Sequence, residues 1–439
     1  MGNYLHKGND GFASLRNSNF VDKSMLIAEV NAAIMTENRF LCVTRARRFG
    51  KSVAIKMLNA YYDNSCDSRE LFSDLAICKD KNFEKHLNRY PVLYLDMTDF
   101  VTKYGRDEHI VEYIKRDICE ELKNLYVEVT MKPNDDVMDL LTSIVDHTGE
   151  KFICLIDEWD ALCREGQEPQ MDEYVDLLRR LFKGSKSEYV FACVYMTGIL
   201  PIKRYNTQSA LNNFDEYTML SPAQMAPYFG FTEKEVQQLC ADAAMDTYAM
   251  KRWYDGYELG KEKSMYNPYA VMRALKRKSY ESFWTSTNTF EGLKRYITMN
   301  FEGLKDDIVH ALNDIPVRVN ALRFSNDMHK VECKDDVLTL LCHLGYLSYN
   351  GKTKCACIPN YEVRQEFETA VADTSWLEVT SALQQSEQLN KDAVTAIQQI
   401  KQQEYVKSLQ HYIGDVILVG INYDKFSKLH TCKIETVKI

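Results

Sequence analysis

The tripeptide Gly50-Lys51-Ser52 is the core of a phosphate-binding loop. The glycine lets backbone N–H groups close around phosphates, the lysine reaches the β- and γ-phosphates, and the serine hydroxyl ligates Mg²⁺. The apolar run Phe40–Thr44 precedes the loop, and residues 53–62 carry apolar side chains at helical spacing. A strand followed by a helix places a helix N-terminus under the phosphates, so this segment predicts a nucleotide site.

The loop departs from the common pattern G-x-x-x-x-G-K-[ST], because Arg45 stands where the first glycine is expected. Arg47 and Arg48 follow it, and guanidinium groups match phosphate oxygens bidentately. We therefore expect at least one of these arginines to contact phosphate. The expected nucleotide-binding residues are Arg45, Arg47, Arg48, Phe49, Gly50, Lys51 and Ser52.

A second apolar run, Phe152–Ile156, leads directly into Asp157 and Glu158. Such a run is typical of a strand covered on both faces, and ligands bind outside the carboxyl ends of parallel strands. We expect Asp157 to hold Mg²⁺ together with Ser52, and Glu158 to activate the water that attacks the γ-phosphate. The alternative is that both carboxylates only cap the following helix. The presence of both halves of an ATPase site favours catalysis, with Glu158 and Lys51 as catalytic residues and Asp157 and Ser52 as metal ligands.

Polar residues after the fourth predicted strand are weaker candidates. Thr197 would lie between the phosphate loop and the carboxylate strand, where it could sense the γ-phosphate; alternatively it packs a turn with Gly198. Lys203 and Arg204 could stabilise the transition state of phosphoryl transfer, although solvated loop charges are the more common case.

Strands and helices alternate over residues 1–220, which predicts an α/β, doubly wound P-loop NTPase core with a parallel sheet. The expected strands are Phe40–Thr44, Val92–Met97, Phe152–Ile156, Tyr189–Met196 and Tyr217–Leu220, with helices such as Glu108–Leu125 and Glu173–Lys183. Residues 221–300 predict a helical lid that opens on a capping box, Thr232 and Glu235. Residues 301–370 combine helices with a hairpin around Asn350-Gly351, as in a winged helix.

Composition limits the class of protein. The 439 residues allow two or three domains, and the net charge of −9 with a pI near 5.6 excludes a global basic field, so any nucleic-acid contact must be local. The 13 cysteines include no C-x-x-C pair, which indicates a reducing, cytoplasmic compartment. Strand alternation explains Cys355 and Cys357 better than a metal site with His343 does. No apolar run approaches the ~20 residues of a membrane span, so we expect no membrane contact.

The order of the motifs resembles that of the bacterial AAA-ATPase-like proteins. The resemblance is carried by Phe20–Ser24, Thr44–Ser52, Tyr94–Met97, Leu155–Asp160, Met196–Gly198, Gly230–Glu235, Trp253–Tyr257 and Tyr266–Pro268. In that family the loop usually reads T-R-P-R-R-F-G-K-S, so Arg45 is typical and Ala46 replaces a proline. The Trp253–Tyr257 motif predicts a tight turn with Gly256 at positive φ, and no chemical role follows from it.

These observations predict an ATP-binding, Mg²⁺-dependent ATPase that turns over slowly or on meeting a partner. That partner could be another protein, a second copy of the chain or a nucleic acid. One alternative is a nucleotide-gated scaffold without turnover, and another is an ATPase that regulates a C-terminal nuclease.

The resemblance also implies a C-terminal PD-(D/E)XK nuclease-like domain, in which an aspartate and an E-x-K strand bind metal. Residues 371–439 resemble only part of it. Asn390–Lys401 and Val416–Tyr423 are similar to the helix and strand that follow E-x-K. Glu387 stands at the junction before them, but Leu389 occupies the position where the lysine of E-x-K is expected. An internal deletion, or omission of residues from the sequence, would each explain this. We therefore predict a packing remnant that does not cleave DNA or RNA with Mg²⁺ or Mn²⁺. Its scattered carboxylates are Asp373, Glu378, Glu387, Asp392, Glu404, Asp415, Asp424 and Glu435.

Overall fold

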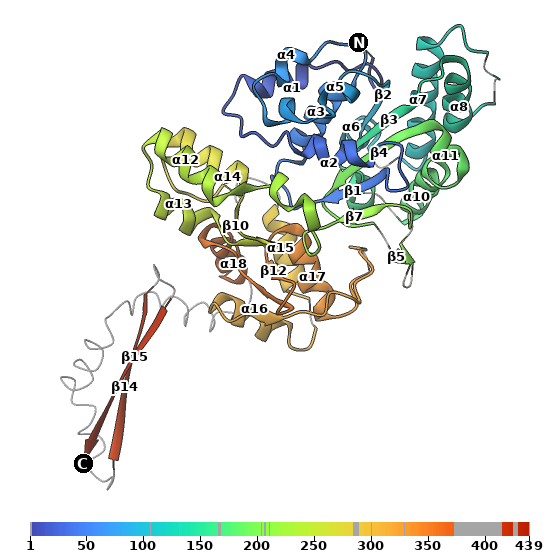
Figure 1. Ribbon diagram of the computed structural model, residues 1–439. Coiled ribbons are helices and arrows are strands. Elements are labelled where there is room, and N and C mark those ends of the chain that lie inside the picture. The colour runs from blue at the N-terminus through green and yellow to red at the C-terminus, as the bar shows by residue number, and fades with distance from the viewer. Residues whose placement is uncertain are drawn as a thin grey trace. The chain divides into compact units, whose positions relative to one another are not determined.

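The computed structural model describes two compact units of the chain, Met1–Gln365 and Glu366–Ile439 (Figure 1). The described residues are 2–372, except 106, 131, 133, 166–167, 203, 206–207, 210, 284–288, 300 and 329, together with 415–424 and 429–438.

A five-stranded sheet forms the centre of the first unit. Its strand order is β2-β3-β4-β1-β7, and all four pairings are parallel. The strands are β1 (Phe40–Thr44), β2 (Val92–Asp96), β3 (Phe152–Asp157), β4 (Phe191–Gly198) and β7 (Asp215–Tyr217). The expected α/β architecture with a parallel sheet is confirmed. The phosphate loop follows β1, and the two carboxylates, Asp157 and Glu158, lie at the end of β3. One strand, β4, separates β1 from β3 in the sheet.

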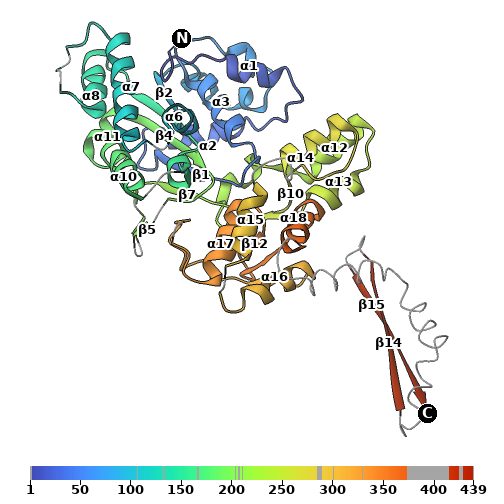
Figure 2. The same cartoon turned by 180° about the vertical axis from the view of Figure 1, so that it is seen from behind.

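Helices cover both faces of this sheet, as the two opposite views show (Figures 1 and 2). One apolar core joins Cys42 and Cys154 of the strands to the helices α6, α7, α8, α9 and α10; the other joins Val43 and Leu155 to α1, α2 and α3. Alternate residues of β1 and β3 therefore enter opposite cores, which explains why these strands are continuously apolar. The helices of this region, including the short 3-10 helix η1, are α1 (Asp10–Arg16), α2 (Leu26–Ala33), α3 (Lys51–Tyr62), α4 (Arg69–Phe72), η1 (Ala76–Lys79), α5 (Phe83–His86), α6 (Met97–Tyr104), α7 (Ile110–Leu125), α8 (Val137–Thr148), α9 (Ala161–Glu165), α10 (Glu168–Phe182) and α11 (Ser185–Val190).

Several expected boundaries were wrong. The second strand ends at Asp96, because the side chain of Asp96 accepts from the backbone of Thr98 and caps α6. The fourth strand begins at Phe191 rather than Tyr189, since the preceding residues form α11. The fifth expected strand, Tyr217–Leu220, shares only Tyr217 with β7. It stops there because the Thr218 hydroxyl accepts from the N–H groups of residues 220 and 221 and turns the chain.

Residues 221–300 combine helices with a small antiparallel sheet, which periodicity alone did not predict. The sheet order is β8-β10-β9, and the expected capping box of Thr232 and Glu235 is present at the start of α12. The elements are η2 (Ala223–Tyr228), β8 (Phe231–Thr232), α12 (Glu233–Ala243), α13 (Thr247–Tyr254), β9 (Tyr257–Leu259), β10 (Glu262–Tyr266), α14 (Pro268–Arg277) and α15 (Thr289–Ile297).

The remainder of the first unit contains the expected hairpin. The strands β12 and β13 pair from Ser348↔Cys357 to Asn350↔Cys355, and β11 pairs with β13 on its other side. The elements are α16 (Leu304–Leu312), β11 (Val317–Arg318), α17 (Lys334–Leu344), β12 (Ser348–Asn350) and β13 (Cys355–Cys357). The comparison of this region with a winged helix remains a prediction.

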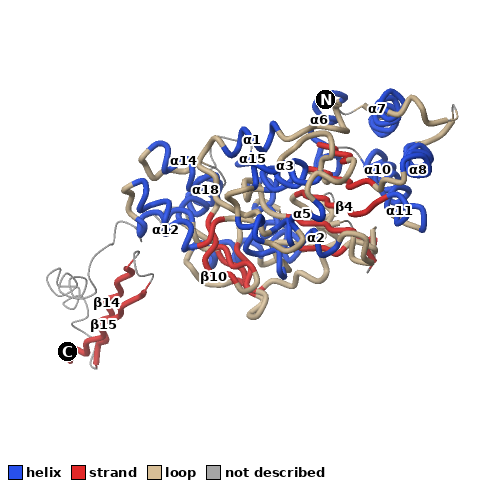
Figure 3. Tube along the Cα trace, turned by 45° about the horizontal axis from the view of Figure 1, so that its top comes forward, coloured by secondary structure: helices blue, strands red, loops and turns tan. Residues whose placement is uncertain are grey.

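The second unit is described mainly by one long hairpin. Helix α18 (Tyr361–Ala372) begins in the first unit and ends in the second. The strands β14 (Asp415–Asp424) and β15 (Leu429–Lys438) pair antiparallel along their whole length, and β14 contains the expected strand Val416–Tyr423 (Figure 3). The expected helix over 390–401 and the carboxylates at 373, 378, 387, 392 and 404 lie outside the described residues. Among the helices that are described, none is long and apolar enough to cross a membrane.

Candidate nucleotide-binding site

The phosphate loop connects β1 to α3. Gly50 caps the N-terminus of α3 with a φ of +90°, a conformation that favours glycine. A Cβ atom at Gly50 would meet nothing within 4 Å, so backbone conformation rather than lack of space accounts for the glycine. The loop is held from the other side by a backbone hydrogen bond of 3.1 Å from the Gly230 N–H to the Phe49 carbonyl.

A cavity of about 720 Å³ opens over this loop. Its size lies within the range of small-molecule and cofactor pockets. Its lining comes from four segments: the loop and α3 (Arg47–Ala54 and Met57), the N-terminal segment (Leu15, Ser18–Val21 and Lys23), the edge of the sheet (Thr98, Glu158, Arg164 and Glu165) and the lid (Tyr228, Gly230, Phe231, Pro268, Tyr269 and Met272). The apolar contribution of the N-terminal segment and the lid was not predicted, because residues so distant in sequence meet only in the folded chain.

The expected metal ligands are close together. The carboxylate of Asp157, at the end of β3, receives a hydrogen bond from the side chain of Ser52 at the start of α3. Burial, and then the nearby acids Asp96 and Glu158, raise the pKa of Asp157 to about 7. One carboxylate and one hydroxyl are oxygen donors of the kind that Mg²⁺ uses together with substrate phosphates and water. The residues therefore fit a magnesium ion bound with a nucleotide.

Glu158 lies between two cations. Its Oε1 is 3.4 Å from Nζ of Lys51, and its Oε2 accepts a hydrogen bond of 2.5 Å from Nη2 of Arg164. Burial alone would raise the pKa of Glu158, but the charges of Lys51 and Arg164 hold it below the usual value. Glu158 has a φ of +50°, an uncommon conformation for this residue type. Lys51, which is 5 % exposed, also donates to the Ala46 carbonyl at 3.3 Å.

Thr197 lies on the strand between the loop and the carboxylates, as expected from its place in the chain. Its side chain is fully buried, and the hydroxyl donates to the Val43 carbonyl of β1 at 2.9 Å. Thr197 is also absent from the cavity lining, so its geometry favours a packing role over contact with a phosphate. Lys203 and the side chain of Arg204 lie outside the described residues; the backbone of Arg204 belongs to the short strand β5 (Arg204–Tyr205), which pairs with β6 (Gln208–Ser209).

The three loop arginines have different surroundings. Arg45 is fully buried, and its Nη1 donates to the carbonyls of Thr44 and Tyr217, each at 2.8 Å. Burial lowers the pKa of Arg45 to about 10. Arg45 does not line the cavity, so the expectation that it contacts the nucleotide is corrected: it ties the end of β1 to the end of β7.

Arg48 connects the loop to the lid, although it also lines the cavity. Its Nη1 donates to the Phe283 carbonyl at 2.8 Å, and its guanidinium lies 4.3 Å from the ring centre of Tyr269. Arg47 is exposed at the cavity, and within the described part of the chain it forms no ion pair. Arg47 is therefore the loop arginine whose position best suits a phosphate contact.

The Trp253–Tyr257 motif lies behind the loop. The expected positive φ of Gly256 is confirmed at +103°, and a Cβ there would lie 1.8 Å from the Pro359 carbonyl oxygen. The Tyr257 ring packs edge-on against Phe49 with ring centres 4.9 Å apart, and its hydroxyl donates to the Gly345 carbonyl at 2.8 Å. The motif thus supports the phosphate loop, a role that sequence did not indicate.

Sequence reasoning also missed Arg164 and Asp160. Arg164 lies on α9, four residues after Asp160 and six after Glu158, and it pairs with both carboxylates. The spacing of an Asp and an Arg four residues apart was the available signal, since such residues share one face of a helix.

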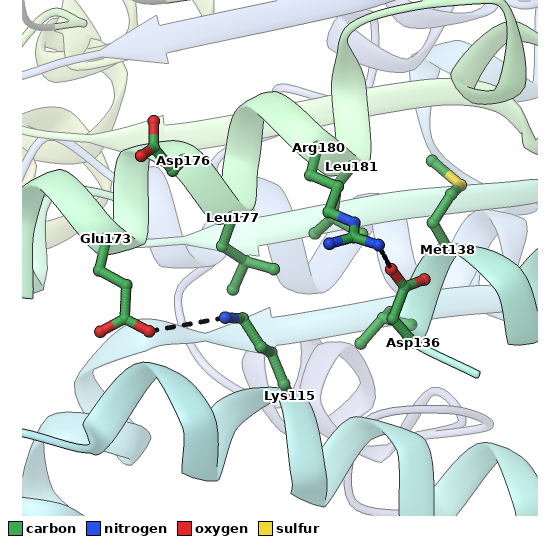
Figure 4. Close-up of a pocket in the computed structure, with 9 residues that line it drawn as sticks. Lys115, Asp136, Met138, Glu173, Asp176, Leu177, Arg180 and Leu181 are labelled. Atoms are coloured by element: carbon green, nitrogen blue, oxygen red, sulfur yellow. Dashed lines mark ion pairs between the residues drawn. The ribbon is translucent and has the colours of Figure 1, made fainter. Parts of the chain in front are cut away.

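Two other sets of polar residues lie away from the loop. A smaller cavity of about 190 Å³ is lined by residues of α7, α8 and α10, and the ion pairs Lys115–Glu173 and Arg180–Asp136 lie at it (Figure 4). Cys355 and Cys357 lie on β13 as expected, and no cluster of three or more His, Cys, Asp or Glu side chains suited to a metal occurs in the described residues.

Comparison with known proteins finds a family similarity in the N-terminal part of the chain. Residues 7–207 match the family model of the predicted AAA-ATPases. This segment is similar to that AAA-ATPase-like family. The match includes the phosphate loop, both carboxylates and Thr197. None of the curated proteins compared with the chain matches it.

Solved structures show only a distant likeness to the chain. The Walker-type ATPase PABY2304 of Pyrococcus abyssi has 13% identity, with 79% of this chain and 94% of that chain covered and a TM-score of 0.38. The Aeropyrum pernix ORC1 protein, solved in complex with DNA, has 10% identity, coverage of 86% and 99%, and a TM-score of 0.28. The ORC2 protein of Aeropyrum pernix, solved as ADPNP–ADP complexes, has 10% identity, coverage of 85% and 98%, and a TM-score of 0.26.

Proposed function

We propose that this protein binds Mg·ATP in the 720 Å³ cavity and hydrolyses it. The observation that carries the proposal is the convergence of four side chains: Lys51, Ser52 and Glu158 line the cavity, and Asp157, which is buried and does not line it, is hydrogen-bonded to Ser52. Lys51 and Ser52 come from the loop side, Asp157 and Glu158 come from the end of β3, and they are joined by the Ser52–Asp157 hydrogen bond and the Lys51–Glu158 ion pair. A cation, a hydroxyl, a metal-binding carboxylate and a second carboxylate are the groups that ATP hydrolysis requires.

The phosphates would lie on the loop at the N-terminus of α3, where backbone N–H groups and the helix dipole favour anions. Lys51 would leave Glu158 and contact the β- and γ-phosphates, while Arg47 would approach from the cavity mouth. Ser52 and Asp157 would hold Mg²⁺, which when bound neutralises charge that develops on the phosphates.

Glu158 would take the proton of the attacking water. The water oxygen forms a bond to the γ-phosphorus, the bond from that phosphorus to the β–γ bridging oxygen breaks, and ADP and inorganic phosphate leave. Lys51 and Arg164 lower the pKa of Glu158, which keeps its carboxylate in the unprotonated form that can accept a proton.

The nucleoside would occupy the apolar side of the cavity. Phe20 and Val21 of the N-terminal segment, Met57 of α3, and Phe231 and Met272 of the lid lie there. Lys23 holds two of these walls together, since its Nζ donates to Glu235 at 2.7 Å and to the Pro227 carbonyl at 2.8 Å. Aromatic and thioether side chains provide contact area for a flat base.

Nucleotide binding is tested first with Lys51→Ala by isothermal titration calorimetry of Mg·ATP. We expect a loss of affinity of at least about tenfold, because a charge-assisted contact to phosphate is removed. Lys56→Ala is the matched control, since Lys56 is an exposed lysine on the same helix that does not line the cavity. Equal affinities for the Lys51→Ala and control proteins, with both folded, would contradict the site.

Turnover is tested with Glu158→Gln, which removes the proposed base and retains its size. We expect Mg·ATP to remain bound and hydrolysis to fall by about a hundredfold or more. A wild-type protein that binds Mg·ATP but releases no phosphate, alone or with DNA or RNA, would instead favour the nucleotide-gated scaffold. The observation that favours this second candidate is that the phosphate loop and the lid line the same cavity, so a bound nucleotide would contact both.

Within the described residues, the C-terminal unit contributes none of those that line the cavity. We propose that it does not cleave nucleic acid, and the measurement is incubation of the purified chain with DNA and RNA under Mg²⁺ or Mn²⁺. Cleavage that is lost in Glu387→Gln or Glu378→Gln would contradict this and support the nuclease alternative.

A further inference from the structure

Arg164 belongs to a chain of four charged side chains that crosses the candidate site. Lys51 pairs with Glu158, Glu158 pairs with Arg164, and Arg164 Nε donates to Asp160 Oδ2 at 3.0 Å. All four side chains are at least four-fifths buried. Because the four charges alternate in sign, each carboxylate is neutralised by a cation, and this group of side chains needs no counter-ion from solvent.

Asp160 fixes one end of this chain to the sheet. Asp160 is fully buried, and its carboxylate accepts backbone hydrogen bonds from Ile199 at 3.2 Å and Leu200 at 2.9 Å, directly after β4. The close approach depends on Gly198, since a Cβ there would lie 2.4 Å from Asp160 Oδ1. Arg164 is therefore paired with a carboxylate that is itself hydrogen-bonded to the backbone directly after β4.

The other end of the chain is free to change partners. Beyond Glu158, the contact of Lys51 in the described structure is a 3.3 Å hydrogen bond to the Ala46 carbonyl. A lysine is a flexible point charge, whereas the guanidinium of Arg164 can hold two carboxylates in fixed directions. The phosphates of ATP would compete with Glu158 for Lys51 but would leave the Arg164–Asp160 pair in place.

We propose that Arg164 is a positioning residue that holds Glu158 beside the γ-phosphate and offsets its charge, so that Lys51 can move from Glu158 to the nucleotide. This inference rests on the proposed function of the same site. In the free protein Glu158 is shared by Lys51 and Arg164. In the nucleotide complex Arg164 remains its partner and fixes the direction in which it accepts the proton of water.

Direct contact of Arg164 with phosphate is the competing explanation, because Arg164 also lines the cavity. A double-mutant cycle separates the two. We would measure the affinity of a non-hydrolysable ATP analogue with Mg²⁺ for the wild type, Arg164→Ala, Glu158→Gln and the double variant by calorimetry. Such a cycle reports the coupling of two side chains and does not require turnover.

Positioning predicts that Arg164→Ala weakens binding by about tenfold in the wild-type background, since Glu158 then holds Lys51 more strongly. In the Glu158→Gln background the same change has less than about a twofold effect, because no carboxylate is left to compete. Equal losses of affinity in the two backgrounds would show a direct phosphate contact and overturn the proposal. No loss in either background would overturn it as well.

Hydrolysis provides a second measurement of the same cycle. Arg164→Ala lowers kcat by about a hundredfold in the wild-type background, as expected for a displaced base, and has no further effect on the residual rate of Glu158→Gln. Arg164→Lys, which keeps one ion pair, gives an intermediate kcat. An unchanged kcat in Arg164→Ala would contradict the proposal.

Controls distinguish this inference from failure of the fold or of the proposed function. Arg180→Ala removes an ion-paired arginine on α10 that lies away from the loop cavity, and we expect it to change neither affinity nor kcat. Thermal melting identifies any variant that does not fold, and if Arg164→Ala is unfolded, Arg164→Lys is carried through the same cycle. A wild type that binds the analogue without hydrolysing ATP would contradict the proposed turnover, whereas the affinity cycle would still decide the role of Arg164.

Discussion

Substitution of Tyr257 tests whether the Trp253–Tyr257 motif supports the nucleotide site. Tyr257→Phe removes only the hydroxyl, whose 2.8 Å hydrogen bond to the Gly345 carbonyl is fully buried, and we expect a loss of about 1–2 kcal/mol in the free energy of unfolding. Tyr257→Ala also removes the ring, and a buried aromatic ring truncated to alanine costs about 3–5 kcal/mol.

The two variants differ in their effect on the loop. The edge-on contact between the rings of Tyr257 and Phe49, with centres 4.9 Å apart, contributes about 0.5–1.5 kcal/mol beyond burial. If that contact keeps the loop ready for phosphate, Tyr257→Ala weakens Mg·ATP binding by about two- to tenfold, and Tyr257→Phe changes it by less than about twofold.

Urea unfolding would give the stabilities, and calorimetry with Mg·ATP would give the affinities. Tyr90→Ala is the matched control, because Tyr90 is a buried tyrosine that stacks on His86 and does not line the cavity. We expect that control to lose stability and keep its affinity for Mg·ATP. The reasoning would be refuted if Tyr257→Phe lost as much affinity as Tyr257→Ala, or if neither lost any.

Three further variants test the electrostatics of the first unit. Arg45→Met should lower the free energy of unfolding by about 2–4 kcal/mol, since one buried and one partly buried carbonyl lose their donor, and should leave the Mg·ATP affinity of the folded protein unchanged in calorimetry. Asp157 has a pKa raised to about 7, so in the nucleotide-free protein it takes up a proton on folding, and stability falls as pH rises from about 4 to 7. Asp157→Asn should therefore gain stability relative to wild type between pH 5 and pH 8 in urea unfolding, and an equal difference at both pH values would contradict this. At Asp117, burial alone would raise the pKa, but hydrogen bonds from Lys103, Tyr104 and Arg116 lower it to about 2. Its contribution, about 1 kcal/mol after solvent screening, is present above pH ~4 and is lost as pH falls toward 2, and Asp117→Asn should flatten that part of the acid unfolding curve.

Local sequence was sufficient for the elements that carry the loop and the carboxylates. Phe40–Thr44 and the Phe152–Ile156 run are continuously apolar because both faces of a central parallel strand are covered, and that property is visible in the order of residues. Gly256 was recognisable as a position of positive φ, since an Asp-Gly pair between aromatic residues is typical of a turn. The types of the residues also suggested the proposed chemistry, because a lysine, a hydroxyl and two carboxylates are the groups that ATP hydrolysis uses.

Tertiary structure decided which side chains of those segments reach the nucleotide site. Arg45 and Arg47 are two residues apart and chemically alike, yet Arg45 is buried and donates to the carbonyl of Tyr217 at the end of β7, whereas Arg47 is exposed at the cavity. Lys51, one of the two partners of Glu158, and the apolar side of the cavity likewise come from segments distant from Glu158 in the chain, whereas its other partner, Arg164, is six residues away. Periodicity describes what one element buries, whereas a site is formed by several elements whose arrangement depends on packing, so no local pattern contains it.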